Sequence, residues 1–226
     1  MSVHISAKKG ETIAFIGSTG SGKSTLINLI PRFYDVTEGS IRIDGIDVRK
    51  FNLKALRKKI GFIRQKNLLF TGTIKSNIKF GKPHATHDEV EHSAKIAQAY
   101  DFITNKEKGF DEPISEGGSN VSGGQKQRLS IARALVRKPE IYIFDDSFSA
   151  LDFKTDAILR KALKKETTDA IVLIVAQRIG SIMDADKIIV LDEGKVVGVG
   201  KHKELLKTCN VYHEIALSQL TEEELA

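Results

Sequence analysis

Apolar residues recur along the chain at two spacings, and together these spacings predict a mixed α/β fold. Short apolar runs typical of buried strands lie at residues 12–16, 60–63, 141–144 and 170–175. The last run is almost continuously apolar, as expected of a central strand in a parallel sheet. Apolar positions at helical spacing predict helices over residues 25–30, 52–59, 73–80, 86–100, 122–138 and 153–166, with two short helices near the C-terminus.

Alternation and turn residues predict three smaller strand features. Val3 and Ile5 alternate with polar residues and predict a short strand over residues 1–9. Residues 39–45 and 188–199 each predict an antiparallel hairpin, with turns at Asp44-Gly45 and Glu193-Gly194. The order of elements implies an α/β core with a helical subdomain inserted at about residues 66–138. An acidic tail, Glu222-Glu223-Glu224, ends the chain.

The segment between the first long strand and the first helix fits a phosphate-binding loop: a glycine, four residues, then Gly-Lys-Ser. Such a loop binds anions because free backbone N–H groups converge there and the helix N-terminus carries partial positive charge. We expect Lys23 to reach the β- and γ-phosphates of a nucleotide and the Ser24 hydroxyl to bind Mg²⁺. The predicted phosphate-binding residues are Gly17, Ser18, Thr19, Gly20, Ser21, Gly22, Lys23, Ser24 and Thr25.

Composition changes this picture only slightly. The 226 residues are 41% hydrophobic and 28% charged, which is ordinary for a soluble globular protein, and no apolar run is long enough to span a bilayer. The single cysteine, Cys209, excludes an internal disulfide and suits a reducing compartment. The net charge of +6 comes from lysines spread along the chain, and the core motifs are not aromatic-rich, so we expect no nucleic-acid partner.

Two further motifs carry candidate chemistry. The strand at 141–144 runs into Asp145, and in P-loop proteins an Asp at that strand end helps to hold Mg²⁺. The next residue, Asp146, lies where a second acid can polarise the attacking water. The Ser-Gly-Gly run at 122–124 opens a helix and offers a second N-terminus with free N–H groups. Because one P-loop already serves one triphosphate, we expect this second anion site to serve a nucleotide on another chain.

Taken in order, these motifs resemble the nucleotide-binding domain of ABC transporters over essentially the whole chain. The resemblance rests on the P-loop, Gln65 as the Q-loop residue, residues 121–125 as the signature, Asp145 as the Walker B acid and residues 149–152 as the D-loop. Residues 69–78 resemble exporters more than importers or DNA-repair ATPases. The resemblance assigns Gln65 to both Mg²⁺ and nucleotide, and adds to the nucleotide-binding residues Ser122, Gly123, Gly124, Gln125 and Asp152.

The resemblance implies one ABC nucleotide-binding domain over residues 1–226. It would have a RecA-like P-loop NTPase core and an antiparallel β subdomain at about residues 1–65 and 139–226, and the helical subdomain at about 66–138. ATP and Mg²⁺ would be its cofactors. Two domains would pair head to tail, each ATP lying between the P-loop of one and the signature of the other. Closure on ATP and opening after hydrolysis would drive attached transmembrane domains at the cytoplasmic face of the membrane.

Two departures from the family pattern lie around the same γ-phosphate. The family usually has Glu where this chain has Asp146, and His where its switch loop has Gln177. Asp is one methylene shorter, and a misplacement of about 1 Å can cost around a hundredfold in rate. Gln can hydrogen-bond a phosphate but cannot carry positive charge. With its signature intact, the chain resembles the degenerate half of a heterodimeric exporter, with a slow catalytic site of its own and a non-identical partner that has Glu and His.

Two alternatives stay open. Beside the slow-site interpretation, the chain would be a competent ATPase of a homodimeric exporter, with Asp146 sufficient as the base, or a regulatory module that closes on ATP without appreciable turnover. Further expectations concern the surroundings of the domain. It would be excised from a longer polypeptide with an N-terminal transmembrane domain, and the adenine-stacking aromatic of the family would lie upstream of Met1. The isolated domain would be soluble, with low intrinsic activity.

Overall fold

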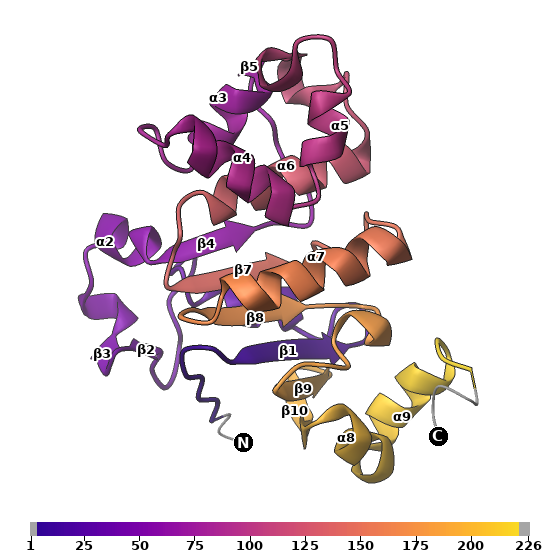
Figure 1. Ribbon diagram of the computed structural model, residues 1–226. Coiled ribbons are helices and arrows are strands. Elements are labelled where there is room, and N and C mark those ends of the chain that lie inside the picture. Colours follow the sequence, from indigo (N-terminus) through magenta and orange to yellow (C-terminus); the bar gives the residue numbers. More distant parts are fainter. Residues whose placement is uncertain (1–3, 222–226) are drawn as a thin grey trace.

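The computed structural model describes residues 4–221 and shows a sheet with helices packed against it (Figure 1). The strands of this sheet are β1 (Thr12–Gly17), β4 (Ile60–Ile63), β7 (Ile141–Asp145), β8 (Ile171–Val175), β9 (Lys187–Asp192) and β10 (Lys195–Gly200). They lie in the order β10-β9-β1-β8-β7-β4. All neighbours pair in parallel except β10, which pairs antiparallel with β9. The expectation of an α/β fold built on a parallel-dominated sheet is confirmed.

The central strands are apolar on both faces because both faces of the sheet are covered. Successive side chains of a strand point to opposite faces. In β1, Ala14 and Ile16 therefore join one cluster of buried residues, while Ile13 and Phe15 join another. The near-continuous apolar run of β8 is divided between the two clusters in the same way. This two-sided burial explains why these strands show apolar runs rather than strict alternation.

The helices lie on both faces of the sheet and beyond both of its edges (Figure 1). They are α1 (Lys23–Asn28), α2 (Leu53–Lys58), α3 (Ile74–Lys79), α4 (His87–Ile96), α5 (Tyr100–Thr104), α6 (Gly123–Leu135), α7 (Phe153–Glu166), α8 (His202–Thr208) and α9 (Asn210–Leu217). Helices α3 to α6 gather beyond the β4 edge, and α7 lies over β7 and β8 (Figure 1). Helices α8 and α9 lie at the opposite end, beside β9 and β10.

Several helices begin at a residue whose side chain caps the helix. The Asn52 side chain accepts hydrogen bonds from two backbone N–H groups of α2. Thr86 and Glu89 form a reciprocal capping box at the start of α4. Ser122 and Gln125 form another at the start of α6. Each box satisfies backbone donors that have no partner within the helix, so short polar motifs fixed these starting points.

Four smaller differences from the expected elements appear. Residues 4–8 form no strand, so the predicted N-terminal strand is wrong; Ile5 and Ala7 alternate into a core cluster without pairing with a neighbouring strand. Helix α1 starts at Lys23 and ends at Asn28, two residues earlier at each end than predicted. The loop at 112–120 contains a short strand, β6 (Pro113–Ile114), which pairs with β5 (Gly72–Thr73). The hairpin predicted at 188–199 is present as β9 and β10, whereas the helix predicted at 86–100 ends at Ile96 and is followed by a second helix that begins at Tyr100. Residues 1–3 and the acidic tail lie outside the described residues.

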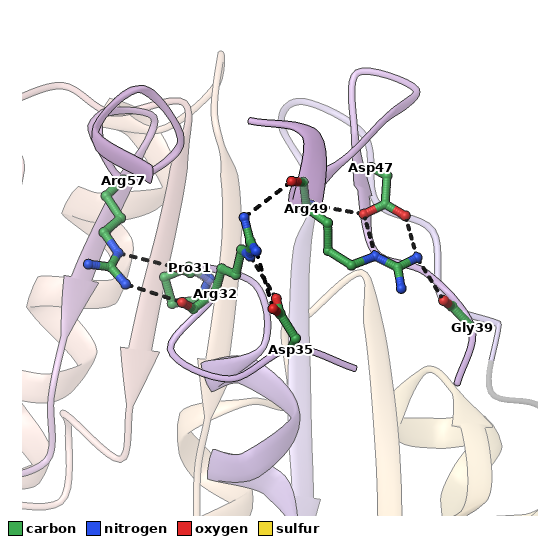
Figure 2. Close-up of polar contacts among 7 residues, drawn as sticks. All are labelled: Pro31, Arg32, Asp35, Gly39, Asp47, Arg49 and Arg57. Carbon is green, nitrogen blue, oxygen red and sulfur yellow. Dashed lines mark hydrogen bonds and ion pairs between the residues drawn. The ribbon is translucent and has the colours of Figure 1, made fainter. Parts of the chain in front are cut away.

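The first predicted hairpin is present as β2 (Arg42–Ile43) and β3 (Ile46–Asp47), with two residue pairs. A ladder this short is marginal by itself. Figure 2 shows the hydrogen bonds by which Arg32, Arg49 and Arg57 join the surrounding segments. Arg57 of α2 donates to the carbonyl oxygens of Pro31 (3.2 Å) and Arg32 (3.1 Å). Arg32 in turn donates to the Arg49 carbonyl at 3.2 Å, and Arg49 donates to the Gly39 carbonyl at 3.2 Å.

A buried amide joins α3 to the segment before it. Asn77 is 2% exposed. Its Oδ1 accepts from the Phe70 N–H and from Arg133 Nη2, both at 2.9 Å. Its Nδ2 donates to the carbonyl oxygens of Phe70 (2.8 Å) and Thr73 (3.0 Å). Because every polar atom of this side chain has a partner, the amide stabilises the junction between the residues after β4 and α6.

We predict that Asn77→Ala lowers the free energy of unfolding by about 3 kcal/mol, because it leaves buried donors and acceptors without partners, at about 1–3 kcal/mol each. Urea denaturation followed by circular dichroism measures this. The control is Asn105→Ala, an exposed asparagine at the end of α5. Equal loss in the two variants would contradict the role given to Asn77.

Candidate functional site

The predicted site residues follow the carboxyl ends of the parallel strands. The P-loop follows β1, Gln65 lies two residues beyond β4, Asp145 ends β7, and Gln177 lies two residues beyond β8. Parallel strands present their carboxyl ends at the same edge of a sheet, which is where ligands bind in open α/β folds. Four segments that are far apart in the sequence therefore meet at one edge.

The P-loop has backbone conformations that require glycine. Gly17, Gly20 and Gly22 have φ values of 153°, 85° and 95°. A Cβ atom on Gly17 would lie 1.9 Å from the Leu191 carbonyl oxygen, so a side chain does not fit there. Nothing lies within 4 Å of the position of a Cβ atom on Gly20. The loop is thus a backbone cradle with open space beside it, as the binding of a phosphate group requires.

Lys23 is folded back onto this loop. Its ammonium group donates to the carbonyl oxygens of Gly17 (2.8 Å) and Ser18 (2.7 Å) and to Ser21 Oγ at 3.3 Å. Burial lowers the pKa of Lys23, an effect that the nearby carboxylates of Asp145 and Asp146 oppose. The cation is therefore held inside the loop. Ser18, Thr19 and Thr25 are exposed beside it.

Ser24 and Asp145 form an oxygen pair next to the loop. Ser24 Oγ donates to Asp145 Oδ1 at 2.8 Å, which brings the first turn of α1 to the end of β7. Within residues 4–221 there is no group of three or more His, Cys, Asp or Glu side chains that could hold a metal. Mg²⁺ is usually held by one or two protein oxygens together with phosphate and water oxygens. The hydroxyl and carboxylate fit that donor chemistry.

Asp146 is a buried residue whose carboxylate accepts two hydrogen bonds. The residue is 8% exposed, and its backbone has a left-handed φ of 48°. Its Oδ2 accepts from Gln65 Nε2 at 2.7 Å and from Gln177 Nε2 at 2.8 Å. Burial and the neighbouring Asp145 raise the pKa of Asp146, although hydrogen bonds and Lys23 oppose this. The two glutamine amides and the buried carboxylate make one hydrogen-bonded group.

The signature residues lie apart from the chain's own P-loop. Ser122 Oγ accepts from the Gln125 N–H at 3.2 Å, and Gln125 Oε1 accepts from the Ser122 N–H at 3.0 Å. A Cβ atom on Gly123 would meet nothing within 4 Å, whereas one on Gly124 would lie 3.3 Å from the Ala150 carbonyl oxygen. Within residues 4–221 no hydrogen bond joins residues 122–125 to residues 17–25. The structure brings the signature beside the D-loop instead.

Asp152 of the D-loop begins α7. Its side chain accepts from the Thr155 N–H at 2.9 Å and from Thr155 Oγ1 at 2.7 Å, and these bonds lower its pKa. The structure thus gives Asp152 a capping role at the start of its own helix.

Ser149, the first residue of the predicted D-loop, also contacts Asp146, since its Oγ donates to the Asp146 carbonyl at 2.8 Å. Two other residues at the site were not found from the sequence. Arg178 donates to the carbonyl oxygens of Ser149 (3.2 Å) and Leu151 (3.3 Å). Gln219 Nε2 donates to the Gln177 carbonyl oxygen. Arg178 adjoins a predicted residue in sequence, but no local pattern points to Gln219, since the contact spans 42 residues.

Comparison with known proteins decides the family. The family model for the ABC transporter matches residues 1–149, which is more than half of the chain. The chain belongs to the ABC transporter family. It is 48% identical over 213 residues to putative multidrug export ATP-binding/permease proteins of several strains of Staphylococcus aureus, covering 94% of this chain and 37% of each relative. The chain thus spans little more than a third of the length of these relatives.

A solved structure agrees with this assignment. An Atm1-family ABC exporter from a bacterium, solved with ATP bound, matches with a TM-score of 0.91 and 38% sequence identity. The match covers 94% of this chain and 38% of the exporter. The expected ABC-type ATP-binding domain, with its P-loop NTPase fold, is therefore confirmed. No helix within residues 4–221 is both long and apolar enough to cross a membrane.

The raised pKa of Asp146 leads to a prediction about stability. A carboxyl whose pKa is raised in the folded state contributes stability that is fully present below its unfolded-state pKa and is lost as the pH rises through its folded-state pKa. Asp146→Asn removes the buried charge but keeps an oxygen that accepts from Gln65 and Gln177. We expect this ABC domain to gain a few degrees in Tm at pH 7, and the gain to shrink as the pH falls towards 4.

Thermal melts across this pH range measure the effect. Asp169→Asn, at an exposed turn before β8, is the control for the loss of one negative charge. A gain in Tm that does not depend on pH, or that the control variant also shows, would mean that burial of the ionised Asp146 carboxylate does not destabilise the fold.

Proposed function

We propose that this chain is the ATP-binding and ATP-hydrolysing domain of a multidrug-type exporter and that its own catalytic site is slow. The observation that carries the proposal is the pairing of a P-loop suited to ATP with a buried Asp146 that two glutamine amides hold. The exporter assignment follows the names of the similar proteins. The slow site follows from the two residue types and their contacts.

Nucleotide binding would use the backbone of the P-loop. The N–H groups of residues 17–25 would bind the phosphates, and Lys23 would exchange its bonds to Gly17 and Ser18 for bonds to the β- and γ-phosphates. Ser24, Asp145 and Gln65 would hold Mg²⁺, which neutralises phosphate charge when bound. The Ser24–Asp145 contact of 2.8 Å supports this because it already brings two oxygen ligands together.

Hydrolysis at this site would depend on Asp146 as the base that orients water. Its Oδ2 accepts two hydrogen bonds from Gln65 and Gln177, and the side chain is short. A general base must reach its water at about 2.6–3.2 Å, so the short side chain works against a productive position, whereas the two amides orient the carboxylate. Gln177 adds hydrogen-bond donors but no positive charge for the transition state. We infer that these effects together make hydrolysis slow.

The signature would complete the site of a second ABC domain. Gly123 is open, and the N-terminus of the 13-residue helix α6 offers backbone donors there. The chain's own phosphate loop lies at another helix N-terminus. We propose a non-identical partner that carries Glu and His and is served by Ser122, Gly123, Gly124 and Gln125. Asp152 would lie at the same interface.

A surface patch would connect the domain to transmembrane domains. Leu68, Phe70 and Phe80 are 61%, 41% and 64% exposed. The Phe70 and Phe80 rings contact each other at 4.6 Å between centroids with a tilt of 35°, and the Arg133 guanidinium lies 5.3 Å and 5.7 Å from the centres of the same two rings. The patch follows Gln65 in sequence and contacts α6 through Arg133, so force on it would reach both nucleotide sites. We propose that the domain lies at the cytoplasmic face of the membrane, where this patch would contact the transmembrane domains.

Two other functions have specific support. Asp146 lies at the carboxyl edge with the P-loop, as a competent ATPase of a homodimeric exporter requires. The hydrogen bonds that hold Asp146 favour instead a regulatory module that closes on ATP without turnover. Turnover by the domain alone and when mixed with a partner domain that has Glu and His distinguishes the three functions.

We predict that Lys23→Ala weakens Mg²⁺-dependent ATP binding at least tenfold, because it removes the cation that meets the phosphates. Isothermal titration calorimetry with ATP and Mg²⁺ measures the dissociation constant. Lys154→Ala, an exposed lysine at the start of α7, is the charge-matched control and is expected to bind like the wild type. If the Lys23 variant and the wild type bound ATP with equal affinity, the assignment of ATP binding to this loop would be wrong.

We predict that Asp146→Glu together with Gln177→His raises hydrolysis at this site. Glu reaches one methylene further towards the water, and His adds positive charge near the γ-phosphate. The effects should be non-additive, the pair exceeding the product of the two single variants, because both act around one phosphate. Single-turnover hydrolysis in a mixed dimer whose other site is disabled measures this. No increase beside an intact partner signature would show that other residues limit the rate.

A further inference from the structure

A residue from the far end of the chain holds the backbone of the switch loop, residues 176–178. Gln219 Nε2 donates to the Gln177 carbonyl oxygen at 2.8 Å, and Gln219 Oε1 accepts from the Ile179 N–H at 2.8 Å. The two bonds flank Arg178. In a parallel sheet, one residue pairs in this way with the C=O before and the N–H after its neighbour. The side-chain amide therefore takes the place of a strand residue beyond the end of β8.

The other hydrogen bonds of the switch loop involve atoms that Gln219 does not contact. The Ala176 N–H donates to the Phe15 carbonyl at 3.1 Å, which ends the pairing of β8 with β1. The Arg178 side chain binds carbonyl oxygens of the D-loop. Ile179 opens a 3-10 helix, η4 (Ile179–Ser181), whose N-terminus has no side-chain cap. Gln219 thus supplies the backbone bonds at the two peptide groups on either side of Arg178.

Gln219 itself projects from a fixed base. Tyr212 and Ala216 of α9 are fully buried, and Tyr212 OH lies 2.8 Å from His202 Nδ1 of α8. The N–H groups of Gln219 and Leu220 both donate to the Ala216 carbonyl, at 3.0 and 2.9 Å. Leu220 packs against the main core cluster. The backbone of Gln219 is consequently fixed through α9 and Leu220 to the core, and its exposed side-chain amide is hydrogen-bonded to the switch loop.

We propose that Gln219 is a positioning residue of this ATP site. It fixes the switch-loop backbone so that the Gln177 side chain meets Asp146 at 2.8 Å. The C-terminal segment after α9 is then a working part of the catalytic arrangement, 73 residues beyond Asp146 in the sequence (219 − 146). This inference rests on the proposed hydrolysis at the site. A shift of about 1 Å in the loop would break the Gln177–Asp146 bond, and such displacements can cost around a hundredfold in rate.

Amide hydrogen exchange of the full 226-residue chain, followed by NMR, tests the geometry. We expect Gln219→Ala to speed exchange of the Ile179 amide roughly tenfold, because the hydrogen bond that protects it is gone. Gln219→Glu keeps an oxygen that accepts from Ile179 and should preserve most of the protection. Ser218→Ala is the matched control, since its hydroxyl bonds the Ile215 carbonyl of its own helix. Unchanged Ile179 exchange in Gln219→Ala would overturn the proposal.

Single-turnover hydrolysis of radiolabelled ATP, with the chain in excess, tests the consequence for catalysis and remains sensitive when turnover is slow. We expect Gln219→Ala to lower the hydrolysis rate about tenfold without changing the concentration of chain needed for half-saturation, because the P-loop is untouched. Gln219→Glu should recover part of the rate, and Ser218→Ala all of it. A rate that is unchanged or raised in Gln219→Ala would overturn the positioning role.

The outcome separates this inference from the proposed function. If the wild-type chain binds and hydrolyses ATP and Gln219→Ala does so equally well, the inference fails and the proposed function stands. If the wild-type chain shows no ATP binding by calorimetry, the proposed function fails, and the positioning role fails with it. A loss of both rate and affinity in Gln219→Ala would indicate general unfolding, which a melting curve would show, and would also count against a specific positioning role.

Discussion

Burying the carboxylate of Asp146 requires hydrogen-bond donors, and the carboxyl edge of the sheet is organised by supplying them. An unpaired carboxylate is costly to remove from water, so each donor contributes to the folded state as well as to the site. Gln65 brings in the residues after β4, and Gln177 brings in the residues after β8. The Asp146 N–H donates to the Val175 carbonyl at 3.0 Å and so extends the pairing of β7 with β8. One acidic side chain therefore links the ends of three strands.

Charges of opposite sign lie near the Asp146 carboxylate and act on its pKa in opposite directions. Asp145 raises the pKa of Asp146, while Lys23 acts in the opposite direction on it, and both acids oppose the lowering of the Lys23 pKa by burial. Lys23 is at the same time bound to two carbonyl oxygens of its own loop. A bound triphosphate would add several negative charges to this group. A bound phosphate would therefore change the charge around both acids, because the Lys23 ammonium that interacts with them and with the loop would also bind the proposed ligand.

The sequence predicted those parts of the molecule that depend on local patterns. The buried strands, the helix starts at Asn52, Thr86 and Ser122, and the glycine positions of the P-loop follow from residue type and spacing. Long-range contacts were beyond such reasoning. Gln65 and Gln177 were predicted to serve the nucleotide, but not to converge on one oxygen of Asp146, because 81 and 31 residues separate them from it. The failed N-terminal strand shows the same limit, since alternation reports burial and not pairing.

The backbone of Asp146 also explains how this residue suits its position. A left-handed φ of 48° is uncommon for residues with a side chain, and Asp and Asn adopt it more readily than most others. Asp therefore relieves some of the backbone strain that a longer side chain would meet, while it loses reach towards the P-loop. Gln177 complements that choice, since a neutral amide donates to a carboxylate without adding charge. The two departures from the family pattern are thus matched to each other in the structure, and this match supports the slow site proposed above.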